Sequence, residues 1–117
     1  MTVYVDDMRA QYGRMLMCHM LADTDVELHA MASRIDVAMR WWQSPAKTSG
    51  SHYDVALSKR ALAVAAGATE ITVRQAAAMN ARRRVTGELG APTEALAWMR
   101  DFNAARRIAA NTARNTA

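Results

Sequence analysis

Residues 14–22, "RMLMCHMLA", constrain the fold more than any other stretch of the chain. Alternate side chains of a β-strand point to opposite faces of the sheet, and here both alternating sets are mostly apolar. One set is Met15, Met17, His19 and Leu21, and the other is Leu16, Cys18, Met20 and Ala22. Such a pattern is typical of a central strand covered on both sides. A chain of 117 residues can form one domain with a real core and is too short for two ordinary ones.

The rest of the chain alternates predicted strands and helices. Residues 2–5, "TVYV", predict a first strand, and residues 37–42 and 69–71 predict two more. Capping residues and apolar stripes predict four helices. The first follows Asp23 and Thr24, and the second runs from Asp54 to Gly67. The third runs from Thr72, where Thr72 and Gln75 have the spacing of a capping box, through Arg84, and the fourth runs from Pro92 towards Ile108. In the last helix the residues expected to face inward are Trp98, Met99, Phe102 and Ala105. Residues 8–13 and 43–51 are predicted loops, residues 87–92 are a predicted turn or linker, and residues 110–117 are expected to fray.

This order of elements predicts the α/β class, as one small domain with a mixed sheet of about four short strands and flanking helices. The first two strands are joined by seven or eight residues, too few for a helical crossover, so we expect them to be antiparallel neighbours. We divide the chain into an α/β core over residues 1–76 and an Arg-rich helical C-terminal extension over residues 77–117.

The basic residues are unevenly placed. Residues 1–73 carry seven Lys or Arg against eight Asp or Glu, whereas residues 74–117 carry eight Arg and three acids. Arginine suits planar, bidentate contacts with phosphate or carboxylate, so the C-terminal part is a candidate surface for nucleic acid or a partner protein. A solvated helical face explains the same pattern. The candidate contact residues are Arg82, Arg83, Arg84, Arg106 and Arg107.

Composition and sequence features indicate the cellular compartment of the protein. The chain begins with Met1 and shows no charged-then-apolar leader, so we expect no signal peptide. Its longest apolar stretches are too short to cross a bilayer, and a single cysteine excludes an internal disulfide and fits a reducing compartment. We therefore expect a cytoplasmic protein. Nine methionines and three tryptophans exceed the needs of a small core and predict a homo-oligomer.

Residues 4–7, "YVDD", match the signature at the catalytic hairpin of reverse transcriptases. A polymerase needs a third carboxylate, two metal ions and a large cleft for nucleic acid, which 117 residues cannot supply. Adjacent strand residues also point to opposite faces, so Asp6 and Asp7 cannot both reach one metal ion unless the strand ends between them. We interpret the motif as a strand end at which one or both acids cap the following loop.

Side chains suited to chemistry gather near the ends of the predicted elements. His52 and Asp54 flank Tyr53 where the long loop is predicted to enter a helix, whose free N–H groups would suit an anion. His19, Asp23, His52 and Asp54 have suitable metal-ligating atoms without a recognised spacing, so a divalent metal is a candidate cofactor. Simpler roles also fit, since Asp23 and Asp54 are good helix caps and His19 suits a hydrogen-bonded core position. Cys18 and His19 are neighbours in a strand and point apart, which disfavours a Cys–His pair.

Several blocks of this sequence resemble a known family. They are "VYVDDMRA.YGRM.MCHM.AD", "ELHAMA" and "HYD..LSKRALAVAAGA.EIT.RQ", and together they cover roughly residues 2–76. They resemble a domain-of-unknown-function family numbered 4031, encoded by phages, prophages and, in a diverged form, actinobacteria. The family pattern falls on Asp6, Gly13, Arg14, His19, Asp23, Glu27, His29, His52, Tyr53, Asp54, Lys59 and Arg60. The resemblance implies a phage or prophage gene and favours His19, His29 and the "HYD" block acting together. Without it, pairing of His29 with Asp25 on an exposed helix face is the simplest account of that histidine.

The first functional hypothesis is a protein that binds a phosphorylated small molecule, most simply a nucleotide or nucleotide-derived signal. Phosphate would meet Arg14, His52, Lys59 and Arg60, Tyr53 would stack, and Asp23 or Asp54 would accept from ribose hydroxyls. The full candidate ligand-binding set is Arg14, His19, Asp23, His29, His52, Tyr53, Asp54, Lys59 and Arg60. A phage gene implied by the family resemblance could use such a pocket to sequester a host immune signal.

Three alternatives remain open from sequence. One is a metal-dependent phosphoesterase or nuclease that uses the four candidate metal ligands around one ion. Another is a nucleic-acid-binding or protein-binding module that acts through the Arg-rich C-terminal helices. The last is a structural or docking protein with no pocket chemistry.

Overall fold

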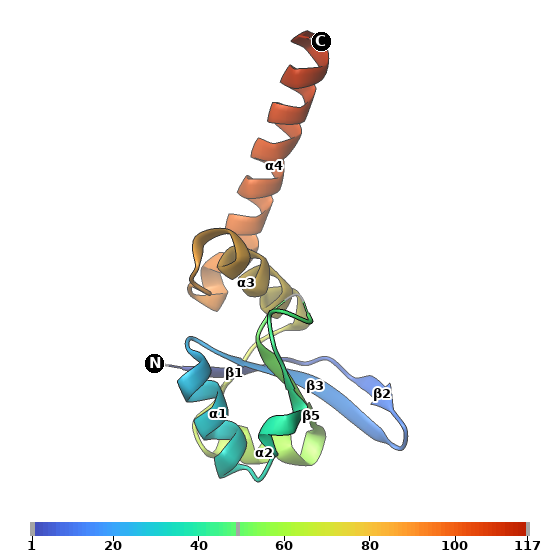
Figure 1. The fold of residues 1–117 in the computed structure, drawn as a ribbon, viewed down its shortest axis with the longest axis vertical. Helices are drawn as coiled ribbons and strands as arrows, with labels where there is room; N and C mark the ends of the chain where they lie inside the picture. Colours follow the sequence, from blue (N-terminus) through green and yellow to red (C-terminus); the bar gives the residue numbers. More distant parts are fainter. Residues whose placement is uncertain (1, 49, 117) are drawn as a thin grey trace.

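The structure of the protein is a computed structural model, which describes residues 2–48 and 50–116. Predictions that concern Met1, the loop at Ser49 and fraying at Ala117 lie outside the described residues. Figure 1 shows a layered body from which one long helix projects, and the molecule extends 55 × 31 × 23 Å along its principal axes.

The body is built on a six-stranded mixed sheet. Its strands are β1 (Val3–Val5), β2 (Ala10–Tyr12), β3 (Met15–Ala22), β4 (Trp42–Gln43), β5 (His52–Ala56) and β6 (Thr69–Glu70). The order is β4-β5-β3-β1-β6, with β2 paired to the first half of β3. All neighbours are antiparallel except β1 and β6. The predicted mixed α/β fold is therefore confirmed, as is the antiparallel pairing of the strands at residues 2–5 and 14–22.

Helices cover both faces of the sheet. They are α1 (Asp25–Arg34), α2 (Leu57–Ala65), α3 (Val73–Thr86) and α4 (Pro92–Thr116), with a short 3-10 helix η1 (Met39–Trp41). In Figure 1, α1 and α2 lie below the sheet, while α3 and the base of α4 lie above it. On the α1/α2 face, Cys18 and Met20 pack in one core cluster, and on the α3 face Leu21 packs in a second. The predicted central strand is confirmed as β3, but its apolar side chains are buried only from Cys18 onward, because Met15 and Leu16 near its start are exposed.

Two predicted elements are wrong in the middle of the chain. Residues 8–13 are not all loop, because the left-handed Gly13 (φ 59°) closes a hairpin that pairs β2 with β3. Residues 37–42 are not a strand, since η1 occupies three of the six and only Trp42 enters β4. These edge segments are short, so tertiary pairing decides their conformation more than their sequence pattern does.

The start of strand β5 also differs from prediction, and it carries two candidate site residues, His52 and Asp54. Residues 52–54 do not enter a helix, because they begin β5, in which buried Tyr53 and Val55 alternate with His52, Asp54 and Ala56. The N-cap of α2 is Ala56, which makes no side-chain capping bond. Asp54 is therefore not a helix cap. The strand also runs antiparallel to β3, so the middle strands do not form the parallel-sheet edge at which ligands commonly sit.

The predicted capping box at the start of α3 is confirmed. The Thr72 hydroxyl accepts from the Gln75 backbone N–H at 3.1 Å, and the Gln75 side chain accepts from the Thr72 N–H at 2.8 Å. Asp7 adds a third bond, because its Oδ1 accepts from the Val73 N–H at 2.8 Å. The second acid of "YVDD" thus caps a helix that is distant in sequence.

Helices α3 and α4 differ from the predicted C-terminal extension in where they begin and end. Helix α3 spans Val73–Thr86 and buries Ala76, Ala78 and Met79 in one core cluster with Leu21, so the proposed boundary between residues 76 and 77 falls within one helix. Gly87, in the left-handed conformation (φ 89°), ends α3, as the predicted turn requires. Helix α4 continues to Thr116, beyond the predicted end near Ile108. Ala105, expected to face inward, is exposed.

No described helix has the combination of length and apolarity needed to cross a membrane.

Replacing Thr72 with Ala removes the hydroxyl that caps α3. We expect Thr72→Ala to lower the free energy of unfolding by about 1 kcal/mol, measured by urea denaturation. The matched control is Thr112→Ala in the exposed part of α4, which should change it by less than about 0.5 kcal/mol. Equal effects of the two substitutions would contradict the capping role.

Candidate metal centre

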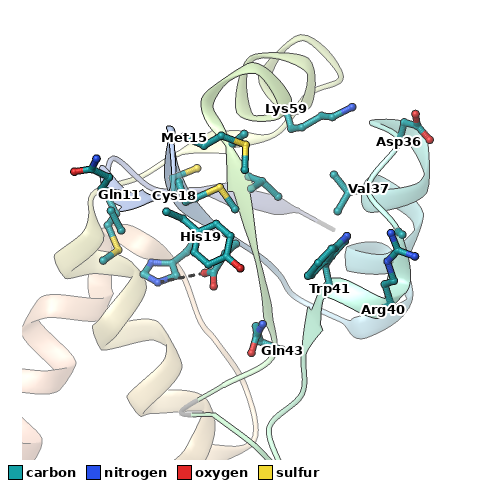
Figure 2. A pocket seen from close by; sticks show the side chains of 18 residues that line it. Gln11, Met15, Cys18, His19, Asp36, Val37, Arg40, Trp41, Gln43 and Lys59 are labelled. Atoms are coloured by element: carbon teal, nitrogen blue, oxygen red, sulfur yellow. Dashed lines mark ion pairs between the residues drawn. The ribbon is translucent and has the colours of Figure 1, made fainter.

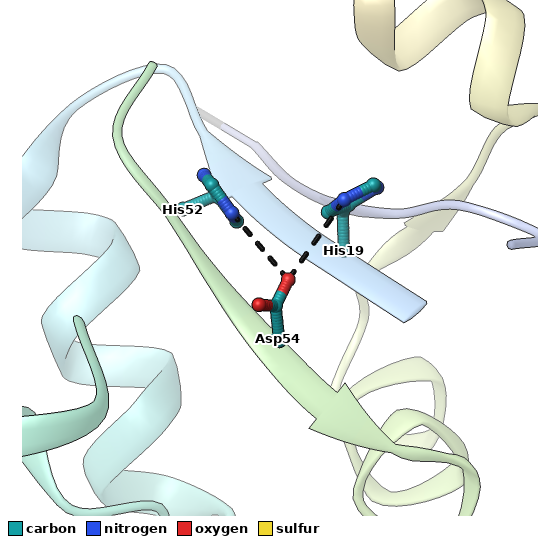
Figure 3. A group of neighbouring side chains, drawn as sticks. All are labelled: His19, His52 and Asp54. Atoms are coloured by element: carbon teal, nitrogen blue, oxygen red, sulfur yellow. Dashed lines mark ion pairs between the residues drawn. The ribbon is translucent and has the colours of Figure 1, made fainter. Parts of the chain in front are cut away.

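Three candidate residues meet on the face of the sheet that α3 covers. The antiparallel register pairs His19 of β3 with Asp54 of β5. His52 lies two residues before Asp54 in β5, so its side chain points to the same face. Figure 3 shows the two imidazole rings directed towards the Asp54 carboxylate, which lies between them.

The atoms that could bind a metal ion are close to one another. Asp54 Oδ1 lies 3.4 Å from His52 Nε2 and 3.8 Å from His19 Nε2. One ligand atom from each residue lies within 4.8 Å of the others. Ligands at about 2.0–2.1 Å from a tetrahedral Zn²⁺ lie roughly 3.3 Å apart. Small side-chain rotations would therefore bring all three atoms to coordination distance.

His19 is oriented by Asp6, a fully buried carboxylate at the end of β1. Asp6 Oδ2 lies 2.6 Å from His19 Nδ1, and Asp6 Oδ1 accepts from the backbone N–H groups of His19 at 2.9 Å and Met8 at 3.2 Å. The carboxylate can only accept, so His19 Nδ1 carries a hydrogen and donates the hydrogen bond to Asp6. His19 Nε2 is then left facing Asp54.

His52 is oriented by a backbone carbonyl. Its Nδ1 lies 2.7 Å from the Gly50 oxygen, which can only accept, so Nδ1 donates and Nε2 faces Asp54. Glycine is needed at position 50 for close approach to α3, because a Cβ there would lie 2.5 Å from Asn80 Oδ1. The His52 side chain is 12% exposed, against 30% for His19 and 45% for Asp54.

The electrostatics of the group favour a bound cation. With both Nδ1 atoms donating, neutral His19 and His52 would present two nitrogen lone pairs to the Asp54 carboxylate. Without a metal ion, the Asp54 carboxylate can accept a hydrogen bond from a histidine Nε2 atom only when that nitrogen carries a hydrogen. The hydrogen bond to Asp6 raises the pKa of His19 above its usual value, with the Asp6 and Asp54 charges adding to it against the effect of burial. The hydrogen bond with His52 lowers the pKa of Asp54.

Burial alone would raise the pKa of Asp6, but its hydrogen bonds with the His19 side chain and backbone lower the pKa on balance. Asp6 therefore stays ionised in the core as the partner of His19.

On the other face of β3, burial raises the pKa of the Cys18 thiol to about 11. Cys18 is thus protonated at neutral pH and unsuited to act as a nucleophile, in line with the sequence prediction.

Two cavities adjoin the group. A cavity of about 660 Å³ is lined by His19 and Asp54 together with Tyr12, Trp41 and Lys59. In Figure 2, Trp41 and Arg40 lie across this cavity from Gln11 and His19. A smaller cavity, about 210 Å³, is lined by His19, His52, Val73, Ala76, Ala77, Asn80 and Arg84. His19 lines both cavities, so the candidate site adjoins each of them.

Asp23, the fourth predicted ligand, is not part of this group. Its Oδ2 accepts from the Thr2 N–H at 2.9 Å, and its Oδ1 accepts from the Tyr4 hydroxyl at 3.0 Å. Asp23 therefore joins the end of β3 to β1. The N-cap of α1 is Thr24, so Asp23 serves neither as the predicted ligand nor as the cap.

Tyr53 and His29 meet on the opposite face of β5. Tyr53 is fully buried, and its hydroxyl lies 2.7 Å from His29 Nδ1. The Tyr53 ring therefore cannot stack on a ligand beside His52. His29 also packs edge-on against Trp42, and Asp25 accepts from Ser51 at 2.6 Å, so the predicted Asp25–His29 pair is wrong. His29 joins α1 to β5 and does not act with His19 and His52.

The predicted phosphate contacts are dispersed. Arg14 is exposed in the hairpin turn and lines neither of the two cavities. Arg60 donates from Nε to the Asp6 carbonyl at 2.9 Å and pairs with Glu70 at 2.9 Å, so it ties α2 to the ends of β1 and β6. Of the four predicted phosphate contacts, only Lys59 and His52 line one of these two cavities.

The five C-terminal arginines do not form one surface. Arg83 is internal, since it donates to the Ala22 and Ser51 carbonyls at 3.3 and 3.0 Å and joins α3 to the sheet. Arg82 lies 4.0 Å from Glu94, and Arg84 lines the smaller cavity. Arg106 and Arg107 are exposed on α4.

Sequence reasoning missed two supporting residues, Asp6 and Gly50. Asp6 was assigned only to capping the loop, which it does through Met8, and its larger role is to orient His19. The partners are 13 residues apart in sequence, and only strand pairing reveals them. The sequence signal that could have identified Asp6 is an acidic residue at the end of a buried strand.

Comparisons with known proteins identify a family and no closer relative. The model of a family described as "Protein of unknown function (DUF4031)" matches residues 3–83. This range is longer than the resemblance seen in the sequence and ends within α3. Neither a curated protein nor a solved structure matches significantly.

The Asp6–His19 pair makes stability depend on pH in a defined direction. Because the folded pKa of His19 is raised above 6.5, its stabilisation is full below pH 6.5 and is lost as the pH rises through the folded pKa. Because the folded pKa of Asp6 is lowered below 3.8, its stabilisation is full above pH 3.8 and is lost as the pH falls through the folded pKa. Between pH 3.8 and pH 6.5 we therefore expect the largest difference in unfolding free energy between the metal-free native protein and the metal-free Asp6→Asn variant.

Urea denaturation in the presence of a chelator, at intervals from pH 4 to pH 9, measures this difference. The Asp6→Asn protein should be less stable by about 1–3 kcal/mol near pH 6. The gap should narrow towards pH 9. A gap that is constant over this range would show that Asp6 does not shift the titration of His19.

Proposed function

We propose that this chain, which belongs to the DUF4031 family of proteins of unknown function, binds a divalent transition metal ion at His19, His52 and Asp54 and hydrolyses phosphate esters with it. The observation that carries the proposal is the convergence of two imidazole Nε2 atoms on one carboxylate. Each histidine also has its Nδ1 directed at an acceptor, Asp6 or the Gly50 carbonyl. In metal sites such acceptors fix the ring and the tautomer that binds the ion.

The set of donors indicates the class of metal. Two imidazoles and one carboxylate suit Zn²⁺, Fe²⁺, Co²⁺ or Ni²⁺ better than Mg²⁺ or Ca²⁺, which prefer oxygen ligands. Three protein ligands leave a coordination position for water, which is the arrangement of catalytic rather than structural zinc sites. The exposure of Asp54 (45%) and His19 (30%) makes that position accessible from solvent.

The bound metal ion would supply a hydroxide at neutral pH and neutralise charge on a phosphoryl group. Hydrolysis would join a water oxygen to phosphorus, break the ester P–O bond and leave a proton from water on the departing oxygen. Asp54 and the two histidines would hold the ion, and buried Asp6 and the Gly50 carbonyl keep the histidines in the tautomer that can bind it.

The larger cavity supports a small phosphorylated substrate. Its volume of about 660 Å³ is within the usual range for small-molecule sites, and most of its lining is apolar. Tyr12 and Trp41, which are 67% and 53% exposed, offer aromatic surfaces, and Lys59 and Arg40 offer positive charge. A nucleotide-like molecule, with a planar ring and a phosphate, has the complementary chemistry.

Metal affinity tests the site itself. In isothermal titration at pH 7.5, we expect the native protein to bind one Zn²⁺ or Co²⁺ per chain. Asp54→Asn and His52→Gln should each weaken binding at least tenfold, because each removes one of three ligands. The matched control is Asp23→Asn, which removes a carboxylate engaged elsewhere and should leave the affinity unchanged. If the control loses as much affinity as the two variants, the site is not the one proposed.

Turnover tests the chemistry. With the metal bound, we expect hydrolysis of p-nitrophenyl phosphate mono- or diesters, its loss after chelation, and recovery when the metal is restored. Asp54→Asn should lower kcat/KM at least a hundredfold while the thermal unfolding of the chelated protein stays near that of the native chain. Metal binding without hydrolysis of any ester in a panel that includes nucleotides would overturn the enzymatic part of the proposal.

A further inference from the structure

Helix α4 is unusual because half of it contacts nothing else in the described chain. It spans Pro92–Thr116, and its first half packs against α3, where Ala95 is fully buried. Residues 105–116 are all exposed. In Figure 1 this part of the helix projects away from the body. At 1.5 Å per residue the free segment is about 18 Å long.

The free segment is positively charged. Arg106, Arg107 and Arg114 lie within it, and the described chain carries no acid after Asp101. Among residues 2–48 and 50–116, none of the three arginines is paired with a carboxylate. Arg106 lies over the Phe102 ring, with the guanidinium carbon 5.7 Å from the ring centroid, and Arg114 donates to Asn111 Oδ1.

The basic residues share one side of the helix. At about 100° per residue, Arg100, Arg106, Arg107 and Arg114 fall within an arc of roughly 120°. Asn103 falls in the same arc and Asn111 lies about 20° beyond its edge, whereas Asp101 lies about 100° beyond that edge. This side, which we call the arginine face, consists of Arg100, Asn103, Arg106, Arg107, Asn111 and Arg114.

Charge decides between the partners that could cover this face. An isolated helical segment of about 12 residues is marginal in water, so a binding partner would stabilise it. A second copy would bring the same positive charge. Beyond Phe102 the segment offers Ile108, 67% exposed, as its one large apolar side chain, which is too little for a helix–helix seam. A polyanion is complementary.

We propose that the arginine face of α4 binds duplex DNA by lying in the major groove. The groove is about 12 Å wide and admits one α-helix, and a segment exposed on every side can enter it. Arginine donates to phosphate oxygens and guanine edges, and asparagine pairs with adenine. The other residues of the segment are mostly Ala and Thr, which are small enough for close approach and can contact thymine methyl groups. This inference does not depend on the metal centre.

Fluorescence anisotropy with a labelled 20-base-pair DNA duplex tests the proposal on the full chain. The test variant is Arg106→Gln/Arg107→Gln/Arg114→Gln, and the matched control is Arg9→Gln/Arg14→Gln/Arg34→Gln, which removes the same charge from exposed arginines outside α4. Glutamine keeps the helix propensity of arginine, and circular dichroism verifies the helix content of both variants. We expect the native chain to bind at 50 mM salt, the test variant to lose at least tenfold in affinity, and the control to lose less than threefold.

The salt dependence adds a second readout. If each of the three arginines neutralises one phosphate, the slope of log K against log salt should be shallower by about 2.7 in the test variant. Three results would overturn the proposal. One is no binding by the native chain at 50 mM salt, another is an equal loss in both variants, and the third is equally tight, α4-dependent binding to duplex RNA, whose deep, narrow groove excludes a helix. A native dimer dissociated only by the test variant, seen by light scattering, would instead assign the face to a second copy.

Discussion

The hydrogen bond between Asp6 and His19 is the interaction on which the site depends. A carboxylate with no exposed surface is retained in the core because two backbone N–H groups and an imidazole satisfy it. The pair also joins the end of β1 to β3, so the fold and the orientation of one candidate ligand share the same bonds. Arg60, which donates to the Asp6 carbonyl and pairs with Glu70, fixes the same strand end from the side of α2.

Strand β5 separates the structural and chemical roles of neighbouring residues. Tyr53 points to the α1 face and forms a buried contact with His29, which holds α1 against the sheet. His52 and Asp54 point to the α3 face, where they meet His19 between two cavities. A block of three consecutive residues that sequence alone treats as one unit thus serves two different purposes. The alternation of a strand is the physical reason.

Much of the fold could be predicted from sequence because local signals were strong there. The two apolar sets of residues 14–22, the Thr72 capping box and the Gly87 helix end each depend on short-range chemistry. The start of β5 was predicted wrongly because Asp54 is a common helix cap, and the period-two pattern of residues 52–56 is too short to outweigh that. Only part of the candidate site could be predicted from the sequence. His19, His52 and Asp54 were among the candidates, but the exclusion of Asp23 and the role of Asp6 required the pairing of β1, β3 and β5.

The most direct test of the central claim is a crystal structure of the protein with Zn²⁺, using anomalous scattering at the zinc edge. The account predicts a single strong peak within about 2.0–2.2 Å of His19 Nε2, His52 Nε2 and an Asp54 oxygen. Asp6 and the Gly50 carbonyl should remain on the two Nδ1 atoms. A peak at other residues, coordination through Nδ1, or no peak at a zinc concentration that saturates the protein in solution would contradict it.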